Sequence, residues 1–319
     1  MTGPTEGKNW RSGPVLVIGA AGVDVIAHLD EGFKPGSSNP AKVRTSYGGV
    51  ARNVAENLAR LGQEVTLLTV TGEDQNGSQV LAYTQEAGVD VSQSIRTDIY
   101  PTGFYMGVVN KKGQTELAVD DMRIMTCLTP EELEKRAKLF KPASLVFLDA
   151  NLPEDTLKAA IGLARKNKVP LCADPASSFV ALKLLPHLPG FFLITPNSAE
   201  AGILTGGEFD SKDRKAAMKV ARHLVNLGVE IALITLAEFG VCYATSETSG
   251  QIPAIKTRVV DPTGAGDALT AAVMFALLND MDIDEAVRLG VSAASLALRH
   301  PGTVVPDLTL EKLYDQLLV

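Results

Sequence analysis

Short apolar runs alternate with segments of helical periodicity along most of the chain, and this alternation constrains the fold more than any other feature. Beyond Leu128, strands are predicted at 144–148, 169–173, 191–194, 231–235 and 241–244, and helices at 130–140, 154–167, 213–227, 268–278, 284–298 and 309–317. Strands that alternate with helices are typically joined by right-handed crossovers. The pattern therefore predicts an α/β fold with a doubly wound, mostly parallel sheet flanked by helices, over residues 13–319.

The first part of the chain shows the same alternation with a β-rich interruption. Strands are predicted at 15–18 and 65–70 and helices at 50–61 and 77–87, whereas 28–47 is predicted to be irregular. Residues 102–109 and 115–119 form a predicted hairpin, because Asn110 and Gly113 between them suit a tight turn. An inserted hairpin often becomes a flap over a site. We therefore expect a small lid formed by residues 28–47 and about 99–120.

Composition excludes several classes of function. The 319 residues carry a net charge of −7, which argues against nucleic acid or an anionic membrane as the main partner. Cys127, Cys172 and Cys242 are far apart in the sequence, which argues against a disulfide framework and a structural zinc site. Residues 1–12 are polar and are expected to form a disordered leader rather than a signal peptide. No apolar run is long enough to span a membrane, so we expect a cytoplasmic location.

The string Asp261-Pro-Thr-Gly-Ala-Gly-Asp267 predicts a tight turn that opens a helix, with Val259 and Val260 ending a strand before it. The first turn of a helix has unpaired N–H groups and the positive end of the dipole, so it suits an anion. A carboxylate at Asp267 would repel an anion, but it could remove a proton from a hydroxyl beside the anion, as in phosphoryl transfer. The alternative is a glycine-rich helix cap in which Asp267 only complements the dipole.

A second group of polar residues lies near the N-terminus. Asp24 follows the first predicted strand, where α/β folds place ligands, and Asn53 lies one turn beyond Gly48 and Gly49. A carboxylate accepts from two vicinal hydroxyls, an amide both donates and accepts, and two glycines allow a sugar close to the backbone. The alternatives are a simple Asp turn at Asp24 and a solvated helix residue at Asn53.

Asp24, the string Gly48-Gly49-Val-Ala-Arg-Asn53-Val-Ala55 and the string 261–267 together resemble the signatures of the ribokinase (PfkB) family of sugar and nucleoside kinases. The resemblance covers roughly Val15 to Leu317. It implies a ribokinase-like fold with a β-lid, and ATP and Mg²⁺ as cofactors. The roles it implies are catalysis by Asp267 with Gly264, Ala265 and Gly266, acceptor binding by Asp24, Gly48, Gly49 and Asn53, magnesium binding by Asn197 and Glu200, and nucleotide binding by Asn197, Thr235, Gly240, Gly264 and Gly266.

Two segments depart from the family pattern. Ala237 stands where the family's nucleotide loop usually has glycine, which weakens the match around Thr235 and Gly240. The stretch 297–302 differs from the loop through which ribokinases bind a monovalent cation. Asp261 is retained, and it is the candidate ligand for a potassium ion.

Four local strings resemble the branch of the family that acts on pseudouridine. They are Ser38-Asn39-Pro40, Gly48-Gly49-Val-Ala-Arg-Asn53, Asp120-Asp121-Met122 and Asp174-Pro175-Ala-Ser177. This resemblance implies phosphorylation of a 5′-hydroxyl, with Asp121 contacting the base, and an exposed lid suggests a homodimer through the lid.

Other functions stay open at this point. Ribose, 2-keto-3-deoxygluconate, fructose phosphate and adenosine are alternative acceptors. A sugar- or nucleoside-binding regulator without catalytic activity is a rival of another class, and the retained Asp267 counts against it. A dehydrogenase is disfavoured because the G-x-G-x-x-G fingerprint is missing after the first strand.

Overall fold

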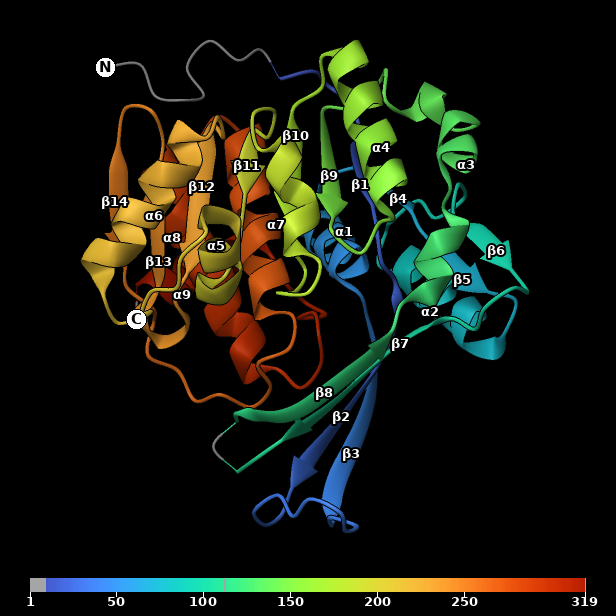
Figure 1. The fold of residues 1–319 in the computed structure, drawn as a ribbon, viewed down its shortest axis with the longest axis vertical. Coiled ribbons are helices and arrows are strands. Elements are labelled where there is room, and N and C mark those ends of the chain that lie inside the picture. The colour runs from blue at the N-terminus through green and yellow to red at the C-terminus, as the bar shows by residue number, and fades with distance from the viewer. Residues whose placement is uncertain (1–9, 112, 319) are drawn as a thin grey trace.

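The computed structural model describes residues 10–111 and 113–318 and is built around a central sheet of eight strands (Figure 1). In the order β14-β13-β12-β11-β10-β9-β1-β4, neighbours are parallel from β4 to β12, and β13 and β14 are antiparallel. The strands are β1 (Val15–Ile18), β4 (Val65–Leu68), β9 (Leu145–Asp149), β10 (Leu171–Asp174), β11 (Leu193–Ile194), β12 (Ile231–Thr235), β13 (Val241–Ala244) and β14 (Ser249–Ile252). The predicted α/β sheet is confirmed.

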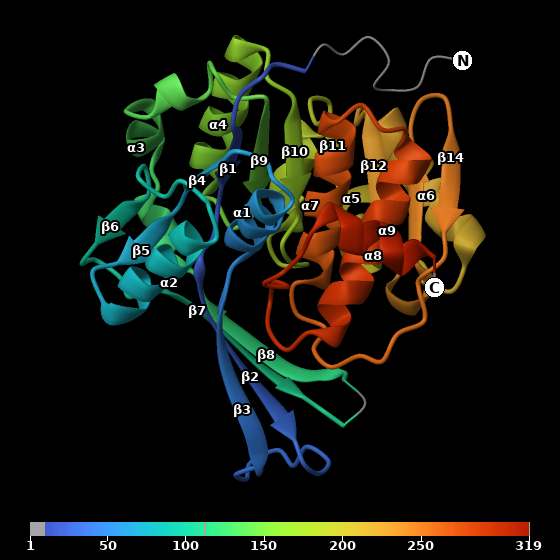
Figure 2. The same ribbon diagram turned by 180° about the vertical axis from the view of Figure 1, so that it is seen from behind.

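Helices cover both faces of this sheet, as the two opposite views show (Figures 1 and 2). One face carries α1 (Val50–Arg60), α7 (Ala265–Leu278), α8 (Ile283–Arg299) and α9 (Leu310–Leu317), and the other carries α3 (Pro130–Glu134), α4 (Glu154–Asn167), α5 (Ser198–Thr205) and α6 (Arg214–Asn226). Alternate residues of β1 show why both faces need cover. Val15 and Val17 join the core on the α7 side, whereas Leu16 and Ile18 join the core on the α4 side.

A separate sheet of four strands projects from the body and forms the lid (Figure 1). Its order is β3-β2-β7-β8, with β2 (Gly22–Leu29), β3 (Ala41–Gly48), β7 (Gly103–Val109) and β8 (Thr115–Asp121). The predicted hairpin is β7 and β8. The prediction that 28–47 is irregular is confirmed for 30–40 and is wrong for the rest, because 28–29 belong to β2 and 41–47 to β3. No apolar run marks β3, because most of its residues are exposed.

Other element predictions need correction. The strand predicted at 65–70 is divided into β4 and β5 (Val70–Gly72), and β5 pairs with β6 (Ile95–Thr97) next to α2 (Gln75–Glu86). The helix predicted at 130–140 is α3 followed by a short 3₁₀ turn. Val259 and Val260 end no strand, and both lie substantially exposed in an extended loop. Apolar residues alone therefore do not predict where strands end in surface loops.

The start of the chain is only partly described. Residues 1–9 of the predicted leader lie outside the described residues, whereas Trp10 packs edge-on against Phe192 with ring centroids 5.3 Å apart. Within 10–111 and 113–318, no helix has both the length and the apolar character needed to cross a bilayer.

Candidate active site

The N-terminus of α7 forms the centre of the site. Gly264 precedes the helix with a φ of 79°, a left-handed conformation that favours glycine, and a Cβ there would lie 2.0 Å from the carbonyl oxygen of Thr303. At Gly266 a Cβ would meet nothing within 4 Å, so this side of the turn is open. The first N–H groups of the helix have no intrahelical acceptor. The predicted tight turn that opens a helix is therefore present.

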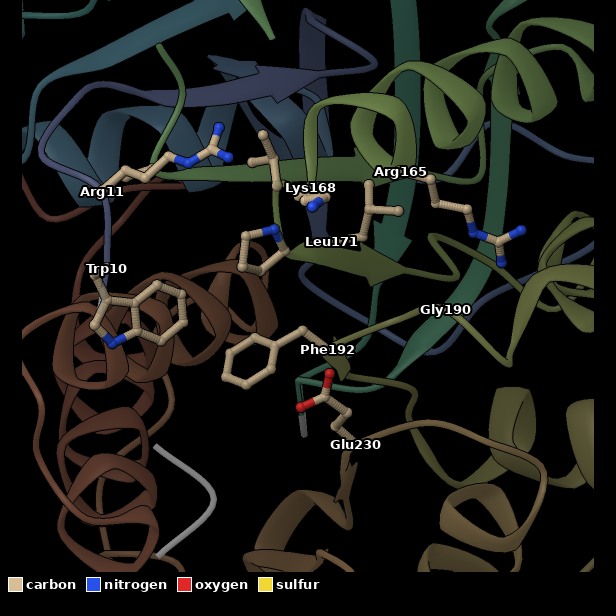
Figure 3. A pocket seen from close by; sticks show the side chains of 11 residues that line it. Trp10, Arg11, Arg165, Lys168, Leu171, Gly190, Phe192 and Glu230 are labelled. Atoms are coloured by element: carbon tan, nitrogen blue, oxygen red, sulfur yellow. The ribbon is translucent and has the colours of Figure 1, made fainter. Parts of the chain in front are cut away.

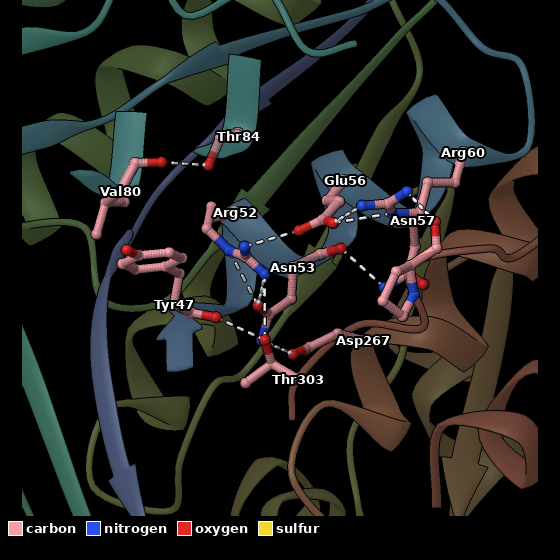
Figure 4. Close-up of polar contacts among 11 residues, drawn as sticks. Tyr47, Arg52, Asn53, Glu56, Asn57, Arg60, Val80, Thr84, Asp267 and Thr303 are labelled. Carbon is pink, nitrogen blue, oxygen red and sulfur yellow. Dashed lines mark hydrogen bonds and ion pairs between the residues drawn. The ribbon is translucent and has the colours of Figure 1, made fainter. Parts of the chain in front are cut away.

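Asp267 lies in this first turn and is held by α1. Its Oδ2 accepts a hydrogen bond of 2.7 Å from Nδ2 of Asn53 (Figure 4). Burial raises the pKa of Asp267 to about 7, with a hydrogen bond from Asn53 acting against it and the charge of Asp24 adding to it. A carboxyl group with a pKa near neutrality suits a general base.

Asp24 is the second buried carboxylic acid of the site, and it belongs to the lid. It lies on β2, rather than after a strand as predicted, and only 5% of its surface is exposed. Burial raises its pKa to about 7, whereas the positive charge of Arg52 lowers it. The charge of Asp24 acts on Asp267 and raises its pKa.

The strand register places a row of side chains across the lid beside Asp24. Asp24 pairs with Ser46 on β3 and Tyr105 on β7, and Tyr105 pairs with Asp120 on β8. Directly paired residues point to the same face of a sheet, so these four residues share the face that Asp24 presents to the site. The pKa of Tyr105 is raised by burial and then by the charges of Asp24 and Asp120, which agrees with this placement.

Glycines allow close packing at the base of the lid. Gly22 pairs with Gly48 and with Gly103, so three glycines lie side by side on the face of Asp24. A Cβ on Gly48 would lie 2.1 Å from the carboxyl group of Asp24, and Gly49, with a φ of 95°, passes close to the backbone of Ala20. Gly48 and Gly49 are therefore required by the close approach of β3 and α1 to the first loop.

Asn197 and Glu200 start α5 as a capping box. The Asn197 side chain accepts from the Glu200 N–H at 3.0 Å, and Glu200 accepts from the Asn197 N–H at 2.9 Å. Burial raises the pKa of Glu200. The pKa of nearby Asp174 is also raised, first by burial and then by the charges of Glu200 and Asp267. The charges of Glu200 and Asp267 therefore both act on Asp174, at the carboxyl end of β10.

The predicted nucleotide residues lie on the neighbouring strand. Thr235 ends β12, donates its backbone N–H to the carbonyl oxygen of Pro196 at 3.0 Å, and forms a bridge with Asn197. Gly240 has a φ of 89°, and a Cβ there would lie 2.1 Å from the carbonyl oxygen of Ile252. Thr235 therefore adjoins the turn that opens α5, whereas Gly240 packs against the end of β14.

The chain matches the model of the pfkB family carbohydrate kinases over residues 14–310. It belongs to this family. It is 32% identical to the pseudouridine kinase of Escherichia coli over 93% of this chain and 94% of that protein, and 28% identical to the guanosine-inosine kinase of Exiguobacterium acetylicum over 92% and 97%. A ribokinase structure from Arabidopsis thaliana, complexed with ribose and ATP, superimposes with a TM-score of 0.82 at 22% identity, over 96% of this chain and 99% of that one.

The comparisons confirm the ribokinase-like fold and an ATP-dependent kinase of the pfkB family. The comparisons therefore favour a kinase over a regulator without catalytic activity. The relatives differ in the acceptor that their names give, so the acceptor of this pfkB kinase is a separate question.

The structure does not bring Asp121 to the pfkB site. Asp121 pairs with Phe104, so it lies on the opposite face of the lid from Asp24, and it forms an ion pair of 2.6 Å with Arg123. That hydrogen-bonded ion pair lowers the pKa of Asp121. The neighbouring residue Asp120 is the one that faces the site, since successive residues of a strand alternate between faces.

Asp261 is buried away from solvent behind the turn. Its Oδ1 accepts a hydrogen bond of 2.9 Å from the backbone N–H of Thr263, which fixes the turn before Gly264. This contact gives Asp261 a structural role.

Sequence reasoning missed several residues of the site. Asp149 is fully buried, and its Oδ2 accepts from the N–H groups of Ala20 at 2.8 Å and Ala51 at 3.1 Å, so it fixes the loop after β1 to the start of α1. Asp149 and Asp174 each end a buried apolar strand, and that position could have identified them. Tyr105, Asp120 and Arg52 carried no such signal, because their roles depend on strand register and helix contacts.

A hollow at the opposite end of the sheet is separate from this site (Figure 3). It has a volume of about 420 Å³ and is lined by residues that include Trp10, Ser144, Leu171, Phe192 and Glu230. Several of these residues stand at or before the amino ends of β9 to β12, whereas α/β folds bind ligands at the carboxyl ends.

Proposed function

We propose that this pfkB kinase transfers the γ-phosphoryl group of ATP to the 5′-hydroxyl of pseudouridine. The observation that supports the reaction most strongly is the position of Asp267, in the open first turn of α7 and hydrogen-bonded to Asn53. The acceptor is proposed from the 32% identity to a pseudouridine kinase, together with the polar row across the lid.

Asp24, Asn53, Gly48 and Gly49 would hold the ribose. The carboxylate of Asp24 can accept from two neighbouring ribose hydroxyls, and Gly48 leaves room for that carboxylate beside β3. The lid would exclude water from the reacting groups. Asp267 would then be left facing the primary hydroxyl.

The proposed reaction is an in-line displacement. Asp267 takes the proton of the 5′-hydroxyl, the oxygen forms a bond to the γ-phosphorus, and the bond from that phosphorus to the β–γ bridging oxygen breaks to release ADP. The N–H groups of Gly264, Ala265, Gly266 and Asp267 stabilise the charge on the transferring group. Thr235 and Gly240 line the side on which we place the nucleotide.

The residues near Glu200 fit a hydrated magnesium ion. Among 10–111 and 113–318, no cluster of three His, Cys, Asp or Glu side chains could hold a metal directly. Mg²⁺ usually keeps several waters and uses few carboxylates, and Asp174, Glu200 and Asp267 raise the local negative charge that such an ion would neutralise. Glu200 and Asn197 would hold the ion through its waters, and the bound ion would neutralise charge on the phosphates.

Asp120 and Tyr105 replace Asp121 as the proposed groups that read the base. Pseudouridine is joined through carbon and exposes one more ring N–H than uridine. A carboxylate at Asp120, on the face of Asp24, can accept from such an N–H. The base would lie under β7 and β8.

Competition among acceptors in one coupled ATP assay tests this proposal. We expect the order pseudouridine, uridine, 2′-deoxyuridine, with free ribose poor because it leaves the lid face empty. The missing 2′-hydroxyl leaves one bond of Asp24 unmade, which costs about 1–3 kcal/mol or roughly 5- to 150-fold in kcat/KM.

Adjacent variants of β8 provide the matched control. Asp120→Asn should reduce the preference for pseudouridine over uridine, whereas Asp121→Asn, on the opposite face, should leave it unchanged. Guanosine, adenosine or ribose exceeding pseudouridine would refute the acceptor and leave the kinase assignment standing.

A further inference from the structure

Arg52 is a fully buried cation beside the active site. None of its surface is exposed, and its guanidinium has five donors and no acceptor, so each donor needs a partner. Nη1 donates to Glu56 at 2.7 Å, Nε and Nη2 donate to Oδ1 of Asn53 at 3.2 and 2.7 Å, and Nη2 donates to Oγ1 of Thr303 at 3.2 Å (Figure 4). Its guanidinium also lies 5.9 Å from the centre of the Tyr83 ring.

These contacts fix the amide of Asn53. The amide has one oxygen acceptor and one nitrogen that donates two hydrogen bonds. Arg52 occupies the oxygen from two nitrogens, so the Nδ2 end must face Asp267, which it meets at 2.7 Å. A rotated amide would turn its oxygen toward the carboxylate and lose both sets of bonds. Arg52 therefore determines which end of Asn53 reaches Asp267.

Thr303 links the same guanidinium to the lid and to α7. Its hydroxyl accepts from Arg52 and donates to the backbone oxygen of Tyr47 at 2.6 Å, at the base of lid strand β3. Its backbone oxygen lies where a Cβ of Gly264 would be, so the Thr303 loop packs against the start of α7. Arg52 thus contacts a residue that joins the lid to the catalytic turn (Figure 4).

The charge of Arg52 is not balanced by Glu56 alone. Glu56 also accepts from Arg60, so two arginines share one buried carboxylate. The remaining positive charge acts on Asp24 and Asp267, and it lowers the pKa of each against the effect of burial. The other charged groups whose fields couple to Asp267 are the carboxylates of Asp24, Asp149 and Asp174.

We propose that Arg52 is a positioning residue for phosphoryl transfer, which orients Asn53 so that Asp267 is held to take the acceptor's proton and which ties this geometry to lid strand β3 through Thr303. The inference rests on the proposed role of Asp267 as the base. Arg52 acts through Asn53 and Thr303 and touches no reacting atom itself.

Two variants separate the geometry from the charge. Arg52→Lys keeps the charge but cannot bond Asn53, Glu56 and Thr303 together, whereas Arg52→Gln loses both. With ATP and pseudouridine, or ribose if that is the better acceptor, we expect Arg52→Lys to lower kcat about 10²-fold with little change in the KM for ATP.

Arg60→Lys is the matched control, because Arg60 bonds the same Glu56 but does not touch Asn53. Its kcat should stay close to that of the wild type. Removing the charge in Arg52→Gln should also raise the apparent pKa of the acidic limb of the kcat profile, since a nearby cation that favours the ionised carboxyl is lost. Arg52→Lys should leave that limb in place.

The outcomes distinguish this inference from the proposed base. Equal kcat values for Arg52→Lys and Arg60→Lys, in an enzyme that Asp267→Asn inactivates, would overturn the role of Arg52 alone. Full turnover in Asp267→Asn would overturn the base and this inference together. If Arg52→Gln does not fold, the Lys pair still decides, because Arg52→Lys retains the buried charge.

Discussion

Two carboxylic acids of the site, Asp24 and Asp267, have pKa values raised to about 7 by burial. Each would lose its proton in the pH range in which a kinase works. The deprotonated form of Asp267 is the one that can accept a proton from a hydroxyl. We therefore expect kcat/KM to rise through about pH 7, because the base is protonated below that value.

The same shift predicts how stability depends on pH. Between its ordinary pKa of 3.8 and about 7, Asp267 holds a proton in the folded protein that the unfolded chain releases. This group's contribution to stability is therefore full below about pH 4 and is lost as the pH rises through about 7. Asp267→Asn, which is neutral throughout, should raise Tm near pH 8 by about 2 °C or more and change it little near pH 4.

Calorimetry at the two pH values checks this expectation. Asp98→Asn, at an exposed position, is the control and should behave like the wild type at both. A Tm of Asp267→Asn that falls at pH 8 would mean that the ionised carboxylate stabilises the fold.

Glu200 offers a second test at the residue scale. Glu200→Gln can keep the capping box, because an amide oxygen can still accept from the N–H of Asn197. The loss of charge should raise the magnesium concentration for half-maximal activity roughly tenfold and leave the KM of the acceptor nearly unchanged. An unaltered magnesium titration would remove Glu200 from the proposed metal site, and exposed Glu208→Gln is the control.

Helix α7 carries Asp267 in its first turn, and the rest of the helix is almost entirely buried. Residues 268–277 are all buried, so the helix is enclosed on every side beyond its first turn. Its packing against α8 is close: a Cβ on Gly290 would lie 2.7 Å from a methyl carbon of Val273. Because the body of α7 is fixed in this way, the direction of Asp267 and of the first N–H groups is fixed as well.

The lid has two faces of different character. Asp24, Tyr105 and Asp120 lie on one, whereas Val43, Met106, Leu117 and Val119 lie on the other and are 62%, 40%, 49% and 53% exposed. An exposed apolar face of this kind marks an interaction surface. We propose that it joins two copies of the chain through their lids.

Charge substitution on β8 tests the dimer. Leu117→Lys with Val119→Lys should give a monomer in sedimentation or light scattering, because each buried lysine would be unpaired. Ala118→Lys adds the same charge to the opposite face and should leave the mass unchanged. A wild-type chain that is monomeric at micromolar concentration would contradict the proposal.

Across the whole molecule, the sequence predicted what local pattern determines. The buried strands of the central sheet and the α7 turn were recognisable because apolar runs and glycines mark them directly. Strand β3 was not predicted because side chains on both of its faces are exposed, so its sequence contains no apolar run. Asp121 was preferred to Asp120 because the register that separates their faces comes from pairing with β7, and no local pattern records it.

Three predictions concern properties that the fold of one chain does not determine. The dimer, the potassium site at Asp261 and the cytoplasmic location stay predictions. The contact of Arg52 with Thr303, 251 positions apart, could not be predicted from one sequence, since it requires the lid, α1 and the loop after α8 to meet.

The turnover number of Asp267→Asn, measured with saturating ATP and pseudouridine, tests the central claim most directly. The amide keeps the shape and the contact with Asn53 but cannot take a proton. We predict a fall in kcat of roughly 10²- to 10⁴-fold with ATP binding largely retained. A kcat within about threefold of the wild type, well outside that range, would contradict the assignment of Asp267 as the base at the start of α7.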